Sequence, residues 1–331
     1  MTNIEFADSR FDEGSQRQWR LIWRAFRKHH LGMVGLAMLS LVVLGVILVP
    51  VLLPDPYGRV ATDASLWAAP IGAVDPANGH RFLLGSDQYG RDNLALVFEA
   101  GRLSLIVAVI PTAMILLIGF VVGALAGYYG GWIDNVLMRV VDFLLALPLL
   151  PAYLIGLRVL NEQEARFRVL PLQEDARDVL MALIAVFVFF GWTGVSRLVR
   201  GRVLSLRTQA YIEAARALGA STRTIMFRHL MPNIATPLLV VGMFAIGDFI
   251  VMEAMLSYFG MGFRDPIHPP VVSWGNIVAT NIDQTWYITN PNPFQQIRGY
   301  LSIFPGVLLF ITVLSINFVG DALRDVLDPH R

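Results

Sequence analysis

Long apolar stretches, separated by more polar segments, dominate the order of residues along this chain. Five of them are long enough to cross a lipid bilayer, since a crossing helix needs about 20 predominantly apolar residues. These five stretches cover residues 31–53, 103–133, 179–196, 230–263 and 299–320. The pattern predicts an all-α membrane protein.

A sixth, less regular apolar stretch covers residues 135–157. It carries Arg139 and Asp142 near its start and Pro148 and Pro151 in its middle, and membrane helices tolerate proline, usually with a kink. We interpret this stretch as a sixth span, because leaving it out would reverse the charge bias described next. With six spans, both termini lie on the same side of the membrane.

Basic residues are concentrated on one side of the predicted membrane. The first 30 residues, Arg139, the segment 197–229 and the tail 321–331 together hold 16 of the 26 Lys and Arg residues. Short loops rich in Lys and Arg stay on the cytoplasmic side. We therefore expect both termini and the 197–229 segment to be cytoplasmic.

The spans divide the chain into five regions. The first span is too long for a signal peptide and no small-residue cleavage site follows it, so we interpret it as a retained anchor. The preceding residues alternate aromatic and aliphatic side chains with arginine, as in an interfacial helix on the lipid surface. The regions are an N-terminal segment (1–30), a first membrane helix (31–53), an extracytoplasmic loop (54–102), a five-helix core (103–320) and a tail (321–331).

Composition narrows the chemistry that this chain can perform. It is 55% apolar and 15% charged, contains no cysteine, and has Lys28 as its single lysine. A phosphate-binding P-loop needs a lysine that follows a glycine, so any ATP chemistry must reside on another subunit. The histidines form no zinc motif and there is no nucleophile elbow. We expect no enzymatic activity, no metal and no nucleic-acid ligand.

Three glycines in the second span recur at four-residue spacing: Gly119, Gly123 and Gly127. A stripe of small residues lets another helix approach closely. The alternative is a helix that is merely rich in glycine.

Three acidic residues fall within or near apolar spans, where a charge usually faces a cavity or a partner. Asp142 lies three residues after Arg139, which favours an ion pair between the two. Asp248 and Glu253 lie on neighbouring helix faces and are candidates either for the lining of a translocation path or for buried hydrogen bonding.

The second outer loop, residues 264–298, carries Trp274, Trp286 and Tyr287 among prolines and asparagines. This mix suits contact with another protein, and an interfacial aromatic belt explains it almost as well.

The cytoplasmic segment 210–232 has the pattern of two short helices. An apolar face recurs at i, i+3, i+4 and i+7, formed by Tyr211, Ala214, Ala215 and Leu218. Gly219 stands where a left-handed residue ends a helix, Ser221 is placed to cap a second helix, and Pro232 is expected to end or kink it. Such an amphipathic helix lies on lipid or docks a partner.

The same segment reads Glu213-Ala214-Ala215, three residues, Gly219, and then Pro232 thirteen residues later. It resembles the EAA loop of the permease subunits of bacterial ABC importers, although His229 and Met231 replace the usual isoleucine and leucine. The resemblance implies a coupling helix that docks on an ATPase subunit through Tyr211, Glu213, Ala214, Ala215, Leu218 and Gly219.

Four further segments are similar to motifs of the peptide branch of these importers, specifically its C-type permease. One small departure is the order Ala100-Gly101 ahead of Arg102, where the family has the reverse. The segments are LGSDQYGRD at 84–92, GYYGGWID at 127–134, EAMLSYFGMG at 253–262 and GDALRDVLDP at 320–329.

This resemblance covers roughly residues 80–329, and it implies a type I ABC importer permease fold in a bacterial inner membrane. It further implies peptide import together with a B-type permease, two ABC ATPase subunits that bind ATP and Mg²⁺, and an extracytoplasmic substrate-binding protein. The alternative is an ion-coupled secondary transporter that uses Asp248 and Glu253. Such carriers commonly contain internal repeats, and this sequence shows none.

Overall fold

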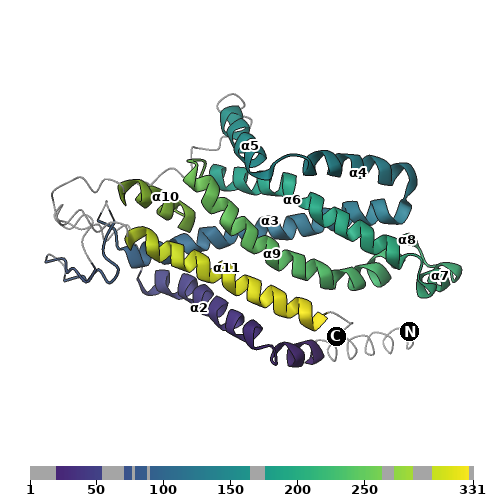
Figure 1. Cartoon of the computed structure of the whole chain (residues 1–331), viewed down its shortest axis with the longest axis horizontal. Helices are drawn as coiled ribbons and strands as arrows, with labels where there is room; N and C mark the ends of the chain where they lie inside the picture. The colour runs from purple at the N-terminus through teal and green to yellow at the C-terminus, as the bar shows by residue number, and fades with distance from the viewer. Residues whose placement is uncertain are drawn as a thin grey trace, which may run out of the picture.

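The computed structural model is a bundle of long helices (Figure 1). It describes residues 20–53, 71–76, 79–87, 90–164, 176–262, 272–285 and 300–327, and within these ranges the only β-structure is two isolated bridges. Residues 20–26 are helical as well. The other elements are α2 (His30–Leu52), α3 (Asn93–Tyr129), α4 (Gly131–Leu145), α5 (Leu149–Glu164), α6 (Ala176–Leu206), α7 (Ala210–Ala217), α8 (Thr222–Thr224), the π-helix η2 (Ile225–Leu230), α9 (Met231–Tyr258), α10 (Trp274–Thr285) and α11 (Tyr300–Leu327).

Five helical segments in the described chain are long and apolar enough to cross a membrane. They belong to α2, α3, α6, α11 and the run from α8 through η2 into α9. The pair α4 and α5 passes the same test only when taken together, and it is bent by 93°. The predicted all-α membrane fold is confirmed.

The glycine stripe of α3 lies directly against α6. A Cβ atom on Gly119 would come within 2.5 Å of the Val195 Cβ, and one on Gly127 within 2.8 Å of the Val203 Cβ; on Gly123 it would overlap the Ser196 carbonyl oxygen. Because the contacts advance in the same direction along both helices, α3 and α6 run parallel.

Parallel packing of α3 and α6 explains what the sixth apolar stretch does. The chain leaves α3 at one end of the bundle and must enter α6 at the other, so the segment between them returns across it (Figure 1). The expected kinked span is in fact two helices, α4 and α5, which meet at a sharp corner. Pro148 lies at this corner, where its ring disfavours helical geometry in the preceding residue.

The α3 helix begins at Asn93, ten residues before the apolar stretch predicts. Asp92 caps it by accepting hydrogen bonds from the backbone N–H groups of Leu94 and Ala95, and its other carboxylate oxygen lies 2.7 Å from His80 Nε2. The described residues of the 84–92 segment, 84–87 and 90–92, thus form a polar turn that starts α3. No cluster of three potential metal ligands occurs among the described residues.

The second outer loop contains a helix, α10, that the sequence pattern did not predict. At the start of α10, Trp274 is fully buried, and its ring N–H donates to the Val97 carbonyl oxygen at 2.8 Å. Its backbone N–H donates to Ser104 Oγ at 3.0 Å. The prediction that Trp274 faces a partner or the lipid interface was wrong for this residue; Trp286 and Tyr287 lie outside the described residues.

The beginning of α2 and the end of α11 lie side by side. His29 Nε2 is 3.3 Å from Asp325 Oδ2, and Gly32 packs against Ala322. Both helix ends are on the same side of the bundle as α7 (Figure 1). The structure thus groups the two ends of the described chain with the 210–232 segment, as six crossings require.

Candidate functional site

The segment between α6 and α9 turns sharply after α7. Gly219 has a φ of +84°, in the left-handed region. Its N–H donates to the Arg216 carbonyl oxygen, and the N–H of Ala220 donates to that of Ala215, both at 3.0 Å. This pair of bonds is the Schellman motif, which commonly ends helices at glycine. The predicted left-handed stop at Gly219 is confirmed.

A second helix follows the turn, as expected, but it ends differently. Ser221 accepts a hydrogen bond from the Thr224 N–H at 3.2 Å, which confirms the cap. The chain then widens into the π-helix η2 and continues into α9 without a stop, with Pro232 in the first turn of α9. The expected helix end at Pro232 is therefore not observed, and the alternative, a kink at Pro232, stays a prediction.

Three aliphatic side chains anchor the segment in the protein core. Ile212, Ile225 and Leu230 are completely or almost completely buried. Ile212 was not among the predicted site residues, although it is the one large aliphatic residue within α7. Its burial holds α7 firmly against the end of the bundle.

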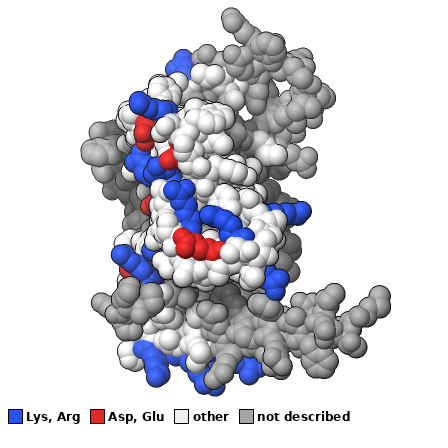
Figure 2. Space-filling model, turned by 90° about the vertical axis from the view of Figure 1, so that its right-hand side faces the viewer, with Lys and Arg blue, Asp and Glu red and all other residues white. Residues whose placement is uncertain are grey.

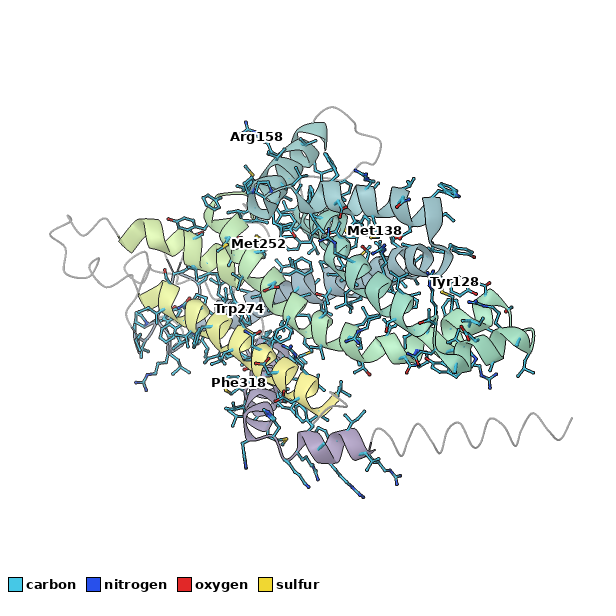
Figure 3. All side chains as sticks on the ribbon, turned by 45° about the vertical axis from the view of Figure 1, so that its right-hand side comes forward. Tyr128, Met138, Arg158, Met252, Trp274 and Phe318 are labelled. Carbon is cyan, nitrogen blue, oxygen red and sulfur yellow. The ribbon has the colours of Figure 1, made fainter. Side chains whose placement is uncertain are left out.

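The end of α3 supports α7 from one side. The Arg207 guanidinium donates to the carbonyl oxygens of Gly127 and Tyr128, at 2.9 and 3.3 Å. The Arg216 guanidinium lies over the Tyr128 ring, 5.8 Å from its centroid, and the Tyr128 hydroxyl is 3.5 Å from Thr222 Oγ1. Figure 3 shows Tyr128 beside this segment. Two motifs that are about 80 residues apart therefore meet here.

The outer side of α7 presents an uncovered apolar face. Leu218 is 89% exposed, more than any other large hydrophobic side chain in the described residues, and Tyr211 is 44% exposed. Ala214 and Glu213 are exposed too, whereas Ala215 is half-buried. Most of the predicted apolar face thus points away from this chain. Lys and Arg side chains outnumber acidic ones on this end of the molecule (Figure 2).

The two acidic residues of α4, Asp134 and Asp142, pair with arginines of α6. Arg197 donates to Asp142, and Arg200 donates through Nε and a terminal nitrogen to both carboxylate oxygens of Asp134. The predicted partner of Asp142, Arg139, was wrong. The spacing of three residues allowed that pair, but α6 lies close to α4 and supplies its own arginines.

The two candidate path acids occupy different environments. Glu253 is 1% exposed and accepts hydrogen bonds from Ser257 Oγ at 2.7 Å and Ser273 Oγ at 2.6 Å, which join α9 to the start of α10. Asp248 is exposed on α9. Glu253 is therefore a contact between helices in this chain, and Asp248 is open to whatever lies beside α9.

Comparisons with known proteins match nearly the whole chain. A family model described as the binding-protein-dependent transport system inner membrane component matches residues 119–331. A second, the N-terminal TM domain of oligopeptide transport permease C, matches residues 17–70. The motifs quoted from the sequence begin at about residue 80 and did not reveal this second region.

Curated relatives are similar over almost their full length. The oligopeptide transport system permease protein OppC of Bacillus subtilis is 30% identical over 94% of this chain and 89% of its own. OppC of Escherichia coli is 31% identical over 96% of this chain and 95% of its own. The glutathione transport system permease protein GsiD of Pectobacterium atrosepticum is 30% identical, with coverages of 96% and 93%.

Proposed function

Because this chain belongs to the family of binding-protein-dependent transport system inner-membrane components, we propose that it is the C-type permease of an ATP-driven peptide importer. It is a multi-pass protein of the inner membrane. In this proposal it forms the translocation path with a B-type permease, docks two ABC ATPase subunits, and receives cargo from an extracytoplasmic binding protein.

The observation that carries the proposal is the rigid, uncovered apolar face of α7. The Leu218 side chain, at the C-terminal end of α7, is almost fully exposed, while Ile212 within α7 is fully buried. A large apolar side chain among arginines at a charged end of the molecule is stabilised by burial against a partner. The Tyr128 and Arg207 contacts transmit a displacement of α7 to α3. Coupling of ATP binding to transport needs such a connection, because the nucleotide must favour one of two states.

Three further features support this proposal; they concern the subunit that binds ATP, the side of the membrane on which α7 lies, and the cargo. The single lysine excludes a P-loop in this chain, so ATP and Mg²⁺ belong to the ATPase partners and this subunit is non-catalytic. The concentration of arginine around the α7 end favours a cytoplasmic location for that end and for both termini. The names of the relatives, which specify oligopeptide and glutathione transport, favour peptide cargo.

Leu218→Ala and Glu213→Ala test the docking face. We expect each to weaken the association of the ATPase with the complex by about tenfold, as loss of an interface anchor does. Each should leave the thermal stability of this subunit unchanged, because both side chains are exposed. Copurification and titration of the ATPase subunit measure the effect.

The matched control is Leu117→Ala, which removes an equally large side chain that is 66% exposed on α3 and should bind ATPase normally. Wild-type ATPase affinity in both α7 variants would contradict the coupling role. Substrate uptake by the purified chain alone in liposomes would favour the secondary transporter instead.

A thermal-shift screen of the cognate binding protein tests the cargo class. We expect peptides to raise its unfolding temperature, because a ligand that binds only the folded state stabilises it. Metal chelates and oligosaccharides serve as comparison panels. Stabilisation by sugars alone would overturn the peptide assignment.

A further inference from the structure

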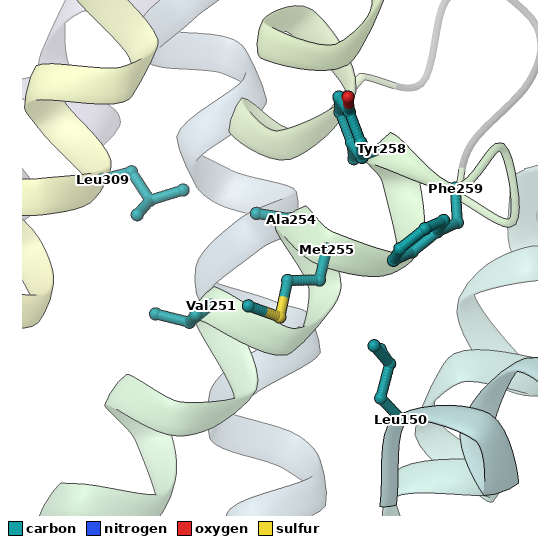
Figure 4. Close-up of a pocket in the computed structure, with 7 residues that line it drawn as sticks. All are labelled: Leu150, Val251, Ala254, Met255, Tyr258, Phe259 and Leu309. Carbon is teal, nitrogen blue, oxygen red and sulfur yellow. The ribbon is translucent and has the colours of Figure 1, made fainter.

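An open apolar groove of about 400 Å³ lies along α9 (Figure 4). Leu150 of α5 reaches toward Met255 of α9 and toward Phe259, which directly follows α9, and Leu309 of α11 lies on the other side of α9. Met255, Tyr258 and Phe259 are 45%, 60% and 53% exposed. The described part of this chain therefore leaves the groove uncovered.

Asp248 lies on the same face of α9 as the groove. Val251, Met255 and Tyr258 follow it at steps of three, seven and ten residues, which share one side of a helix.

The Asp248 carboxylate has no hydrogen bond or ion pair with any described residue. An ionisable group within a membrane-spanning helix is costly unless it faces water, a partner or a transported substrate. Glu253, on another face of the same helix, shows the contrast: two serine hydroxyls bind its carboxylate inside the protein. Asp248 has no such internal role.

The groove lies far from the α7 end of the molecule. With a rise of 1.5 Å per residue, Asp248 is roughly 25 Å and Tyr258 roughly 40 Å from the start of α9 at Met231. If α7 is cytoplasmic, the groove is in the outer half of the membrane. Cargo that arrives from outside would meet it early.

We propose that this face of α9 binds the peptide cargo: Asp248 binds the N-terminal ammonium group, and the groove between α5 and α9 holds an apolar side chain. A carboxylate one to two helical turns, about 5–11 Å, from an apolar groove complements a peptide whose N-terminal ammonium group and an apolar side chain are separated by that distance. The volume lies within the range of small-ligand sites. The inference rests on the proposed peptide import.

A cysteine at Met255 tests the groove directly, since the chain has no other cysteine. The assay uses the complete importer in proteoliposomes, with cysteine-free partners, binding protein and ATP. The probe is an imported tripeptide with a free N-terminus and a bromoacetyl group on its lysine side chain. We expect Met255→Cys to be alkylated during turnover, and Leu117→Cys on α3 to stay unmodified; intact mass of the subunit reports both.

Asp248→Asn, added to Met255→Cys, tests the ammonium site. We expect alkylation to slow by about tenfold, because a hydrogen bond to a charged group is lost. Glu99→Gln is the control: this acid pairs with Arg102 on α3, and its variant should react at the original rate. The N-acetylated probe should react slowly with or without Asp248→Asn.

Uptake of the unmodified tripeptide by the wild-type complex tests peptide import separately from cargo binding in the groove. ATP-dependent uptake without alkylation at Met255→Cys would overturn the groove assignment and leave peptide import standing. An unchanged rate with Asp248→Asn would overturn it as well. If no peptide is taken up, both the proposed function and this inference fail.

Discussion

Gly219→Pro is expected to abolish ATP-dependent uptake while the importer still assembles its permease subunits. Proline holds φ near −65° and has no N–H, whereas Gly219 requires a φ of +84° and donates to the Arg216 carbonyl oxygen. The turn after α7 must therefore rearrange, and Leu218 moves with it. We expect a loss of uptake of at least about tenfold, the factor that corresponds to ~1.4 kcal/mol of coupling free energy.

Gly219→Asn is the matched control for this turn. Asparagine adopts the left-handed conformation more readily than other residues with a side chain, and a Cβ atom on Gly219 meets nothing within 4 Å. Most of the uptake should therefore remain. Uptake and ATP hydrolysis are measured on the same proteoliposomes, so that uncoupled hydrolysis is distinguished from loss of the ATPase. Normal uptake and assembly with Gly219→Pro would refute the coupling role of the turn.

Gly123→Val is expected to destabilise the subunit more than any other single change in the glycine stripe. Even a Cβ atom at Gly123 would overlap the Ser196 carbonyl oxygen, and the Val199 Cβ lies only 2.8 Å from it. Neither the backbone of α6 nor a β-branched side chain moves aside easily, so the two helices must separate. Overpacking of this kind costs about 3 kcal/mol at the upper end of its usual range.

Gly194→Val, on α6, is the control for the stripe. It introduces the same side chain into a helix, but a Cβ atom at Gly194 meets nothing within 4 Å. We expect a fall of several degrees in the apparent unfolding temperature in detergent for Gly123→Val and little change for Gly194→Val. Equal unfolding temperatures for the two variants would show that close α3–α6 contact is not needed for stability.

The glycine stripe of α3 shows which part of the helix packing could be predicted from the sequence alone. Four-residue spacing predicted that one face of α3 packs closely, and the structure identifies α6 as the helix that packs there. The spacing contains no information on the partner, because any helix with a complementary face fits it. The parallel direction of α6 agrees with the predicted span between the two helices, whereas the sharp corner that divides this span into α4 and α5 is found only in the structure.

The 210–232 segment also contains some features that the sequence predicts and others that it does not. Gly219 and Ser221 were predicted correctly because caps and left-handed turns depend on a few neighbouring residues. Ile212 was overlooked, since its burial depends on the position of α7 against the bundle. The π-helix η2 carries no local signal that distinguishes it from an α-helix.

Local properties of the sequence determined the membrane class of this protein, the approximate positions of its spans and the turn at Gly219. Hydrophobicity, periodicity and backbone preference all act over a few residues and can be read along the chain. Tertiary structure alone decided the burial of Trp274, the pairing of Asp142 with Arg197, the corner between α4 and α5, and the groove beside Asp248. Each of these depends on contacts between residues that are distant in sequence, or on the direction in which one helix packs against another.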